Sequence, residues 1–294
     1  MASPFSVVQK LPYTPIKNYI HPTPRQPTRK GDPMTIAAAF RCNDGVLLAA
    51  DTLITFVGGS AKKYESKLFQ INVDLDIHLA YAGDPYFVKD YVEELRKLTT
   101  GKTESDALSL AKQVSKRMFR ERRKEFCAGM LLTIREGSSV SLYLAEETHF
   151  TKVDKYAVLG IGFEQAEALV NPYYRARMGL AESEYLARYV LYKVKKFVQH
   201  CGGDTEIKKV RDDGALRLHI FKQVTVRTSQ EIEDDFAYLD RKLLPLLLAF
   251  SDLKIDKKTF RKLLNESNRA LEKYRNDLRE RYPKILEKAL DNLD

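Results

Sequence analysis

Short apolar runs bounded by turn residues dominate the chain after residue 33. Three pairs of such runs lie at residues 35–41 with 46–51, 68–73 with 77–82, and 130–135 with 140–145. The first pair flanks the turn sequence Asn43-Asp44-Gly45, a further run ends at Val158-Leu159, and residues 210–219 are again hairpin-like. Runs of this length beside Asn, Asp and Gly are typical of strands joined as hairpins, so the sequence predicts antiparallel sheets.

Apolar residues spaced three or four positions apart predict helices between these strands. One helix is expected to begin at Pro85, because Asp84 can cap its first turn and proline suits the first helical position. Two more are expected over residues 105–125 and 182–199. The order of strands and helices predicts an α+β fold with two antiparallel sheets face to face and helices on both outer sides, a four-layer αββα sandwich.

The two ends of the chain differ from this middle part. Residues 1–33 hold seven of the eleven prolines, which fix φ and remove backbone donors, so they are predicted to form an extended, flexible leader. The last 80 residues contain no glycine, and their apolar residues recur at helical spacing from Thr228 onward. The predicted organisation is a leader at 1–33, a sandwich domain at 34–221 and an added helical region at 222–294.

Composition excludes several classes of protein. The hydrophobic content of 44% is too high for a disordered chain, and no apolar run approaches the roughly 20 residues that span a bilayer. Three cysteines are too few and too scattered for a disulfide framework or a zinc site, and the five histidines show no ligand spacing. No secretory signal is visible at the start. We therefore expect a cytoplasmic protein with no membrane, metal or cofactor.

The formal net charge of +9 is spread thinly along the chain. The leader carries +4, residues 222–294 carry +2, and the middle carries only +3. The densest basic run, residues 116–124, is interpreted as the solvated end of a helix, where cations suit the helix dipole. Nucleic acid is therefore not expected as a partner. A nucleic-acid-binding protein that contacts phosphates through this run is the weakest of the three functions considered for this chain.

Residues 34–51 read Met34-Thr-Ile-Ala-Ala-Ala-Phe-Arg-Cys-Asn-Asp-Gly-Val-Leu-Leu-Ala-Ala-Asp51. This segment resembles the start of β-type proteasome subunits and of the bacterial two-component proteasome-like peptidase. Lys67 follows Asp51 at the family's spacing for its active-site lysine. The match continues through Ala80-Tyr-Ala-Gly-Asp84, Gly160-Ile-Gly162, Gly202-Gly203 and Val210-Arg-Asp-Asp-Gly214. The resemblance covers about residues 34–221 and implies the fold of the N-terminal nucleophile hydrolases.

The same resemblance implies a proteasome-like threonine-type peptidase or amidohydrolase that acts in protein catabolism. Thr35 would be the nucleophile and, through its own α-amino group, the base. Lys67 would hold down the pKa of that amine by like-charge repulsion, and Asp51 would pair with Lys67. The backbone N–H of Gly83 would stabilise the oxyanion, and the substrate pocket would be lined by Ile54 and Tyr81.

The resemblance also implies partners. It implies a peptide or protein substrate, assembly with further copies of the chain as a homo-oligomer of ring-like form, and an ATP-dependent unfoldase.

Three positions depart from the family pattern. Ile161 stands where the family has Ser between two glycines, and Val198 and Cys201 stand where it has Asp and Ser before the late Gly-Gly. His200-Cys201 is interpreted as structural rather than as a thiol nucleophile with its base. The register leaves two alternatives open: an ungapped count back from Asp51 puts Thr35 first, whereas aligning Met34-Thr-Ile-Ala with the family's Thr-Thr-Ile-Ala puts Met34 first.

Thr35 lies inside the sequence and has no free amine until the preceding residues are removed. Autolysis in the family follows a glycine, whereas Pro33-Met34 precedes Thr35 here. Alternatively, translation begins at Met34 and removal of this methionine exposes Thr35. The alternative to a peptidase is a catalytically inactive proteasome-like structural or interaction subunit that keeps its N-terminus.

Overall fold

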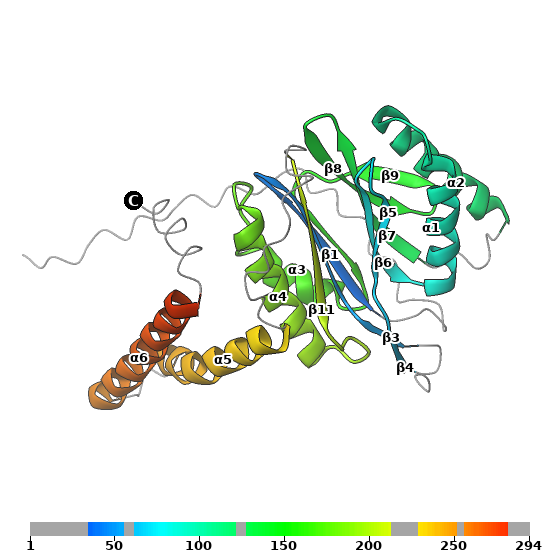
Figure 1. Cartoon of the computed structure of the whole chain (residues 1–294). Coiled ribbons are helices and arrows are strands. Elements are labelled where there is room, and N and C mark those ends of the chain that lie inside the picture. Colours follow the sequence, from blue (N-terminus) through cyan, green and yellow to red (C-terminus); the bar gives the residue numbers. More distant parts are fainter. Residues whose placement is uncertain (1–34, 56–61, 122–127, 213–228, 252–255, 282–294) are drawn as a thin grey trace, which may run out of the picture.

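The computed structural model describes residues 35–55, 62–121, 128–212, 229–251 and 256–281 (Figure 1). The leader, the end of the helix expected over 105–125 and the second half of the hairpin expected over 210–219 lie outside these ranges. The structural statements that follow concern the described residues.

Two antiparallel sheets form the centre of the molecule (Figure 1). The first has the strand order β10 (Tyr156–Gly160), β1 (Ile36–Cys42), β2 (Gly45–Asp51) and β11 (Thr205–Arg211). The second has the order β5 (Leu68–Asn72), β6 (Ile77–Gly83), β7 (Ala128–Glu136), β8 (Ser139–Glu146) and β9 (His149–Lys152). A short pair, β3 (Leu53–Thr55) with β4 (Lys62–Tyr64), follows the end of β2.

Helices cover the outer face of each sheet. The helices of the sandwich are α1 (Pro85–Thr99), α2 (Glu104–Glu121), α3 (Phe163–Val170) and α4 (Leu180–Phe197). Side chains of α1 and α2 share a core with the second sheet, and side chains of α3 and α4 share a core with the first. Asp84 caps α1 as expected, because its carboxylate accepts hydrogen bonds from the backbone N–H groups of Tyr86 and Phe87. The predicted four-layer αββα sandwich is confirmed.

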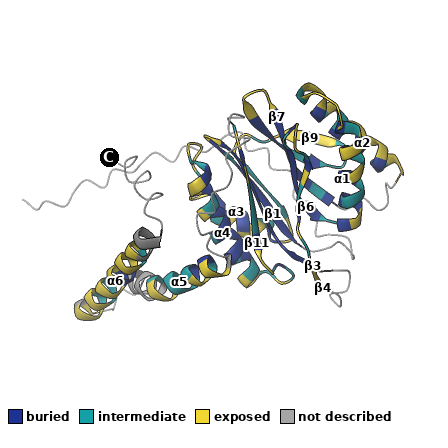
Figure 2. Cartoon of the chain, viewed as in Figure 1, coloured by how far each residue is buried: buried dark blue, intermediate teal, exposed yellow. Residues whose placement is uncertain are grey.

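Alternating side chains of β1 explain how the layers stack. Ala37 and Ala39 face the second sheet, whereas Ile36 and Phe40 face the helices of the first sheet. Successive side chains of a strand point to opposite faces, so one strand supplies small residues between the sheets and large ones beneath the helices. All four side chains are fully buried. Figure 2 shows this buried band running along the strands of both sheets.

The C-terminal part forms two further helices, α5 (Ser229–Ser251) and α6 (Lys257–Arg281). The start of α5 packs on α4, where Ile232 and Phe236 are buried together with Tyr192. From there α5 leads away from the sandwich with α6 beside it (Figure 1). Most described positions of α6 are exposed (Figure 2). None of the described helices combines the length and the apolar character that are needed to cross a membrane.

Four elements were not expected from the sequence: the strands β3, β4 and β9, and the helix α3. The three strands have only three or four residues each, which is too short for an alternating pattern to be recognised. The first strand of the 210–219 hairpin begins earlier than expected, because β11 already starts at Thr205. It ends at Arg211, and the hairpin from residue 213 onward lies outside the described residues.

Candidate active site

Thr35, Asp51 and Lys67 meet at one end of the sandwich. Thr35 directly precedes β1, Asp51 ends the neighbouring strand β2, and Lys67 directly precedes β5 of the other sheet. The hydroxyl of Thr35 donates to Asp51 Oδ1 over 2.7 Å, and Lys67 Nζ donates to Thr35 Oγ1 and to Asp51 Oδ1, the latter over 2.5 Å. Three residues that the resemblance singled out, separated by up to 32 positions, thus form one hydrogen-bonded group.

The ammonium group of Lys67 is fully buried. Besides Thr35 and Asp51, it donates to the backbone carbonyl of Leu53 over 2.5 Å. The three acceptors match the three hydrogens of a protonated lysine. Burial lowers the pKa of Lys67, and the negative charge of Asp51 opposes this by raising it, with a net lowering. The positive charge of Lys67 is therefore stabilised by these three hydrogen-bond partners rather than by water.

The carboxylate of Asp51 is also fully buried, and backbone groups complete its hydrogen bonding. Ile36 N donates to Oδ1 over 3.2 Å, and Gly202 N donates to Oδ2 over 2.8 Å. Charge-assisted bonds of this kind fix the orientation of a carboxylate. Asp51 is thus held from β1, from Lys67 and from the loop that follows α4.

The main chain of Thr35 is fixed by the turn after β10. Ile161 N donates to the carbonyl of Thr35 over 3.0 Å. Gly160 has φ = +102°, and a Cβ added there would lie only 1.9 Å from the same carbonyl oxygen. A glycine is therefore required beside Thr35. The isoleucine that replaces the family's serine contributes its backbone N–H, while the residue as a whole is 39% exposed.

The loop between α4 and β11 packs against the residues that follow Asp51. Leu53 N donates to Gly202 O over 3.0 Å, and Thr52 N donates to Asp204 O over 3.1 Å. In return, Asp204 N donates to Thr52 Oγ1 over 2.8 Å. The loop therefore holds both Asp51, through Gly202 N, and Leu53, whose carbonyl binds Lys67.

Cys201 lies in this loop with 6% of its surface exposed. Burial raises the pKa of its thiol to about 12, the charge of Asp51 adds to the rise, and Lys67 opposes it. The thiol is therefore neutral at physiological pH, and a neutral thiol is a weak nucleophile. This agrees with a structural role for His200-Cys201.

The other predicted site residues, Gly83, Ile54 and Tyr81, make no hydrogen bond to this group among the described contacts. Gly83 ends β6 with φ = +123°. Ile54 is buried in β3. Tyr81 is fully buried, stacks on Phe69 with ring centroids 5.9 Å apart, and its hydroxyl finds no hydrogen-bond partner among the described residues. The oxyanion role of Gly83 and the substrate contacts of Ile54 and Tyr81 remain predictions.

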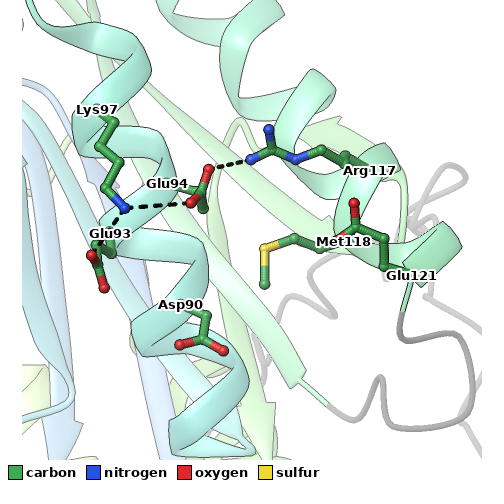
Figure 3. Close-up of a pocket in the computed structure, with 7 residues that line it drawn as sticks. All are labelled: Asp90, Glu93, Glu94, Lys97, Arg117, Met118 and Glu121. Atoms are coloured by element: carbon green, nitrogen blue, oxygen red, sulfur yellow. Dashed lines mark hydrogen bonds and ion pairs between the residues drawn. The ribbon is translucent and has the colours of Figure 1, made fainter.

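A separate surface pocket lies between α1 and α2 (Figure 3). Its charged groups pair mainly with one another: Lys97 Nζ lies 3.0 Å from Glu93 and 3.5 Å from Glu94, and Arg117 also pairs with Glu94. None of the predicted site residues lines it. In the described part of the chain, no group of three or more His, Cys, Asp or Glu residues is arranged to hold a metal ion.

Several contributors to the site were not identified from the sequence, among them the carbonyl of Leu53 and the N–H of Gly202. Both are backbone groups, so their residue types carry no signal of their own. The Gly202-Gly203 pair was noticed only as part of the family pattern. The structural reason for the pair is close packing: a Cβ added at Gly203, where φ is +74°, would lie 2.3 Å from Thr52 Oγ1, and one added at Gly202 would lie 3.1 Å from Leu53 Cδ2.

Two antiparallel sheets packed face to face, with helices on both outer sides, form the four-layer sandwich of the N-terminal nucleophile hydrolases. A sequence model described as Proteasome subunit matches residues 34–210. The chain therefore belongs to the proteasome subunit family. No curated protein sequence matches it.

Solved structures agree with this fold. The chain is similar to an Anbu (Gly-1) mutant from Hyphomicrobium sp. strain MC1, with a TM-score of 0.57, 15% identity, and coverage of 76% of this chain and 98% of that one. It is equally similar to Anbu, an ancestral beta-subunit, from Yersinia bercovieri, with a TM-score of 0.57, 14% identity, and coverage of 76% and 99%. At these identities the likeness concerns the fold alone.

Proposed function

We propose that this chain is a proteasome-like threonine-type peptidase or amidohydrolase whose nucleophile is Thr35, exposed as the N-terminal residue. The observation that carries the proposal is the position of Thr35 Oγ1 between the ammonium of Lys67 and the carboxylate of Asp51. An ammonium directed at a hydroxyl oxygen favours the alkoxide character that develops when this oxygen attacks a carbonyl carbon.

The proposed reaction uses the residue itself as base. The hydroxyl of Thr35 attacks the substrate carbonyl while its proton passes to the α-amine of Thr35, and the oxyanion is stabilised by the N–H of Gly83. The protonated amine then gives its proton to the leaving amine, and an ester to Thr35 remains. Water hydrolyses this ester with the α-amine again as base. Lys67 and Asp51 orient the hydroxyl throughout.

The geometry supports Thr35 rather than Met34 as the first residue of the mature chain. The Thr35 side chain takes part in the group with Asp51 and Lys67, and Met34 lies outside the described residues. The proposal therefore requires removal of residues 1–34, either by processing or by translation from Met34 followed by removal of the methionine. A ring-like assembly of copies, a polypeptide substrate and an ATP-dependent unfoldase belong to the same proposal.

A non-catalytic proteasome-like subunit is the second candidate. The positions that carry Ser, Asp and Ser in the family hold Ile161, Val198 and Cys201. These side chains offer neither a hydroxyl nor a carboxylate to an amine at Thr35. Cys201 in particular offers a buried thiol with a raised pKa.

N-terminal sequencing and intact mass decide between the candidates when they are combined with peptide hydrolysis. Chains expressed from Met1 and from Met34 are compared, and a form that begins at Thr35 is expected to cleave fluorogenic peptides. In that form Thr35→Ala is expected to lower kcat by roughly 10³-fold or more, because the nucleophilic hydroxyl is lost although the α-amine remains. Thr100→Ala is the control, because Thr100 is an exposed residue after α1.

Two results would contradict the proposal. A Thr35→Ala variant with undiminished activity would show that another group is the nucleophile. A chain that begins at Thr35 and cleaves no peptide of a diverse library would favour the non-catalytic subunit.

A further inference from the structure

A carboxylate on α5 reaches the loop that holds the candidate site. The side chain of Glu233 is 14% exposed, and its Oε1 accepts a hydrogen bond from Thr205 Oγ1 over 2.9 Å and another from Lys195 Nζ. Lys195, near the end of α4, also donates to the carbonyl of Gly203 over 2.8 Å. Glu233 thus joins α5, α4 and the start of β11 at one point.

Lys195 depends on Glu233 because its side chain is only 8% exposed. A buried ammonium that loses its counter-charge is strongly destabilised, and it moves toward water where it can. Such a movement would break the bond to the carbonyl of Gly203. The position of Gly203 therefore depends on a residue that lies 30 positions further along the chain.

Gly203 lies next to the backbone group that holds Asp51. Gly202 N donates to Asp51 Oδ2 over 2.8 Å, and Gly202 O accepts from Leu53, whose own carbonyl binds Lys67. Gly203 packs so closely on Thr52 that an added Cβ would lie 2.3 Å from Thr52 Oγ1.

The strand register points the same way. Thr205, the other partner of Glu233, pairs directly with Asp51 between β11 and β2. Both contacts of Glu233 therefore lead to the carboxylate beside Thr35.

We propose that Glu233 is a positioning residue of the active site, which fixes the loop of residues 201–204 so that Gly202 and Leu53 hold Asp51 and Lys67 in place. The inference rests on the proposed function and extends it. Glu233 lies outside residues 34–210, the part that the family model matches. The contribution of α5 to the site therefore comes from a part of the chain beyond the matched family domain.

The same helix interface supplies a matched control. Asp240 of α5 pairs with Lys193 of α4 over 2.5 Å, and both side chains are largely buried, at 24% and 17% exposure. This pair also holds α5 on α4. None of its described bonds reaches the loop of residues 201–204. A variant at Asp240 therefore loosens α5 without removing the contact on which the inference depends.

Hydrogen exchange and steady-state kinetics together test the inference. Glu233→Gln and Asp240→Asn are prepared in the full chain, and amide exchange is followed over residues 200–206. Glu233→Gln is expected to speed exchange there, and Asp240→Asn is not. In the form that begins at Thr35, Glu233→Gln is expected to lower kcat about tenfold with KM within twofold, because misplaced catalytic groups slow the chemical step more than they weaken binding.

A double-mutant cycle adds a readout that a merely structural role would not move. Lys195→Met is expected to lower kcat and to be non-additive with Glu233→Gln, since both act through the same bond to Gly203, whereas Asp240→Asn is expected to be additive with either. Unchanged exchange in Glu233→Gln overturns the inference, and so does faster exchange with unchanged kcat. If the parent chain that begins at Thr35 hydrolyses nothing, the proposed function fails and the positioning role fails with it. If the parent chain is active but Glu233→Gln leaves exchange or kcat unchanged, the positioning role alone fails and the proposed function stands.

Discussion

Gly160 is the residue at which a single added carbon would disturb the site most directly. Gly160→Ala introduces a Cβ 1.9 Å from the carbonyl oxygen of Thr35 at φ = +102°, so the backbone of one or both strands must move. We expect a loss of about 3 kcal/mol or more in the free energy of unfolding, measured by urea denaturation. Peptidase activity is expected to fall as well, because Thr35 is displaced.

Gly137→Ala is the matched control for this prediction. Gly137 also has a positive φ, +65°, but no atom lies within 4 Å of an added Cβ. The substitution is expected to cost about 1 kcal/mol, the conformational strain without the clash. Equal losses at the two positions would mean that the close approach to Thr35 relaxes freely.

At the scale of residues, the sequence pointed to the side chains of Thr35, Asp51 and Lys67 but not to the backbone groups that hold them in place. Thr35, Asp51 and Lys67 were identified because their residue types and spacing resemble those of the family. The bonds from Gly202 and to Leu53 involve backbone atoms, which any residue carries, so only the folded chain could reveal them. Lys67 shows a second limit, because a lysine in a sequence is expected to be exposed, and only its three buried acceptors explain a fully buried ammonium.

At the scale of elements, one hydrogen-bond network joins the two sheets. It lies near the end of β1 and the start of β6, away from Thr35. Arg135 of β7 donates from Nε to Asp76 Oδ2 over 3.1 Å, and it also donates to the backbone carbonyls of Arg211 and Asp212 over 2.7 Å each. His78 Nε2 lies 2.8 Å from Asp76 Oδ1. Arg135 therefore joins the turn before β6 to the end of β11 in the other sheet.

This network predicts a dependence of stability on pH. Burial would raise the pKa of Asp76, but the hydrogen bonds from His78 and Arg135 outweigh it and lower the pKa to about 2 from 3.8. A carboxylate with a lowered pKa stabilises the fold above its unfolded pKa, and this contribution is lost as the pH falls through the folded value. We expect Asp76 to contribute about 2 kcal/mol above pH ~5, and to lose this between pH ~4 and ~2.

Asp76→Asn isolates this contribution. Asp76 has φ = 50°, which asparagine also tolerates, so the backbone of the turn is preserved. In urea denaturation from pH 7 to pH 2.5, the difference from the parent chain is expected to shrink as the pH falls. Asp154→Asn, at an exposed residue, should show no such trend. A difference for Asp76→Asn that is constant over this range would assign its effect to lost hydrogen bonds rather than to charge.

The elements themselves were predictable where the pattern was long. The strands β1 and β2 and the helix α1 have clear turn and cap residues, and their observed bounds lie within one residue of the expected ones where an end was predicted. The eight residues of α3 span about two turns, and the hairpin strands β3 and β4 lie on either side of residues outside the described part. In segments this short, tertiary packing rather than local pattern decides the conformation.

At the scale of the whole molecule, α5 is the element whose place the sequence could not give. Its periodic apolar residues predicted a helix, but they do not show which element of the fold the apolar face packs on. In the structure this element is α4. Phe236 packs on its residues Tyr189 and Tyr192, with ring centroids 5.4 Å and 6.0 Å apart. Two flanking ion pairs, Lys193 with Asp240 and Lys195 with Glu233, fix the direction of α5.

This small interface predicts that α5 opens without the rest of the molecule. Only Ile232 and Phe236 of α5 are buried with α4 among the described side chains, whereas the sandwich has three extended cores. Phe236→Ala removes most of the apolar contact, so amide exchange over residues 230–243 is expected to become about tenfold faster or more, while exchange over residues 36–42 is unchanged. Phe236→Leu keeps part of the contact and should have a smaller effect. If residues 36–42 instead exchange faster by the same factor, α5 and the sandwich unfold as one cooperative unit. Glu233 would then be held by the stability of the whole fold rather than by its own helix interface.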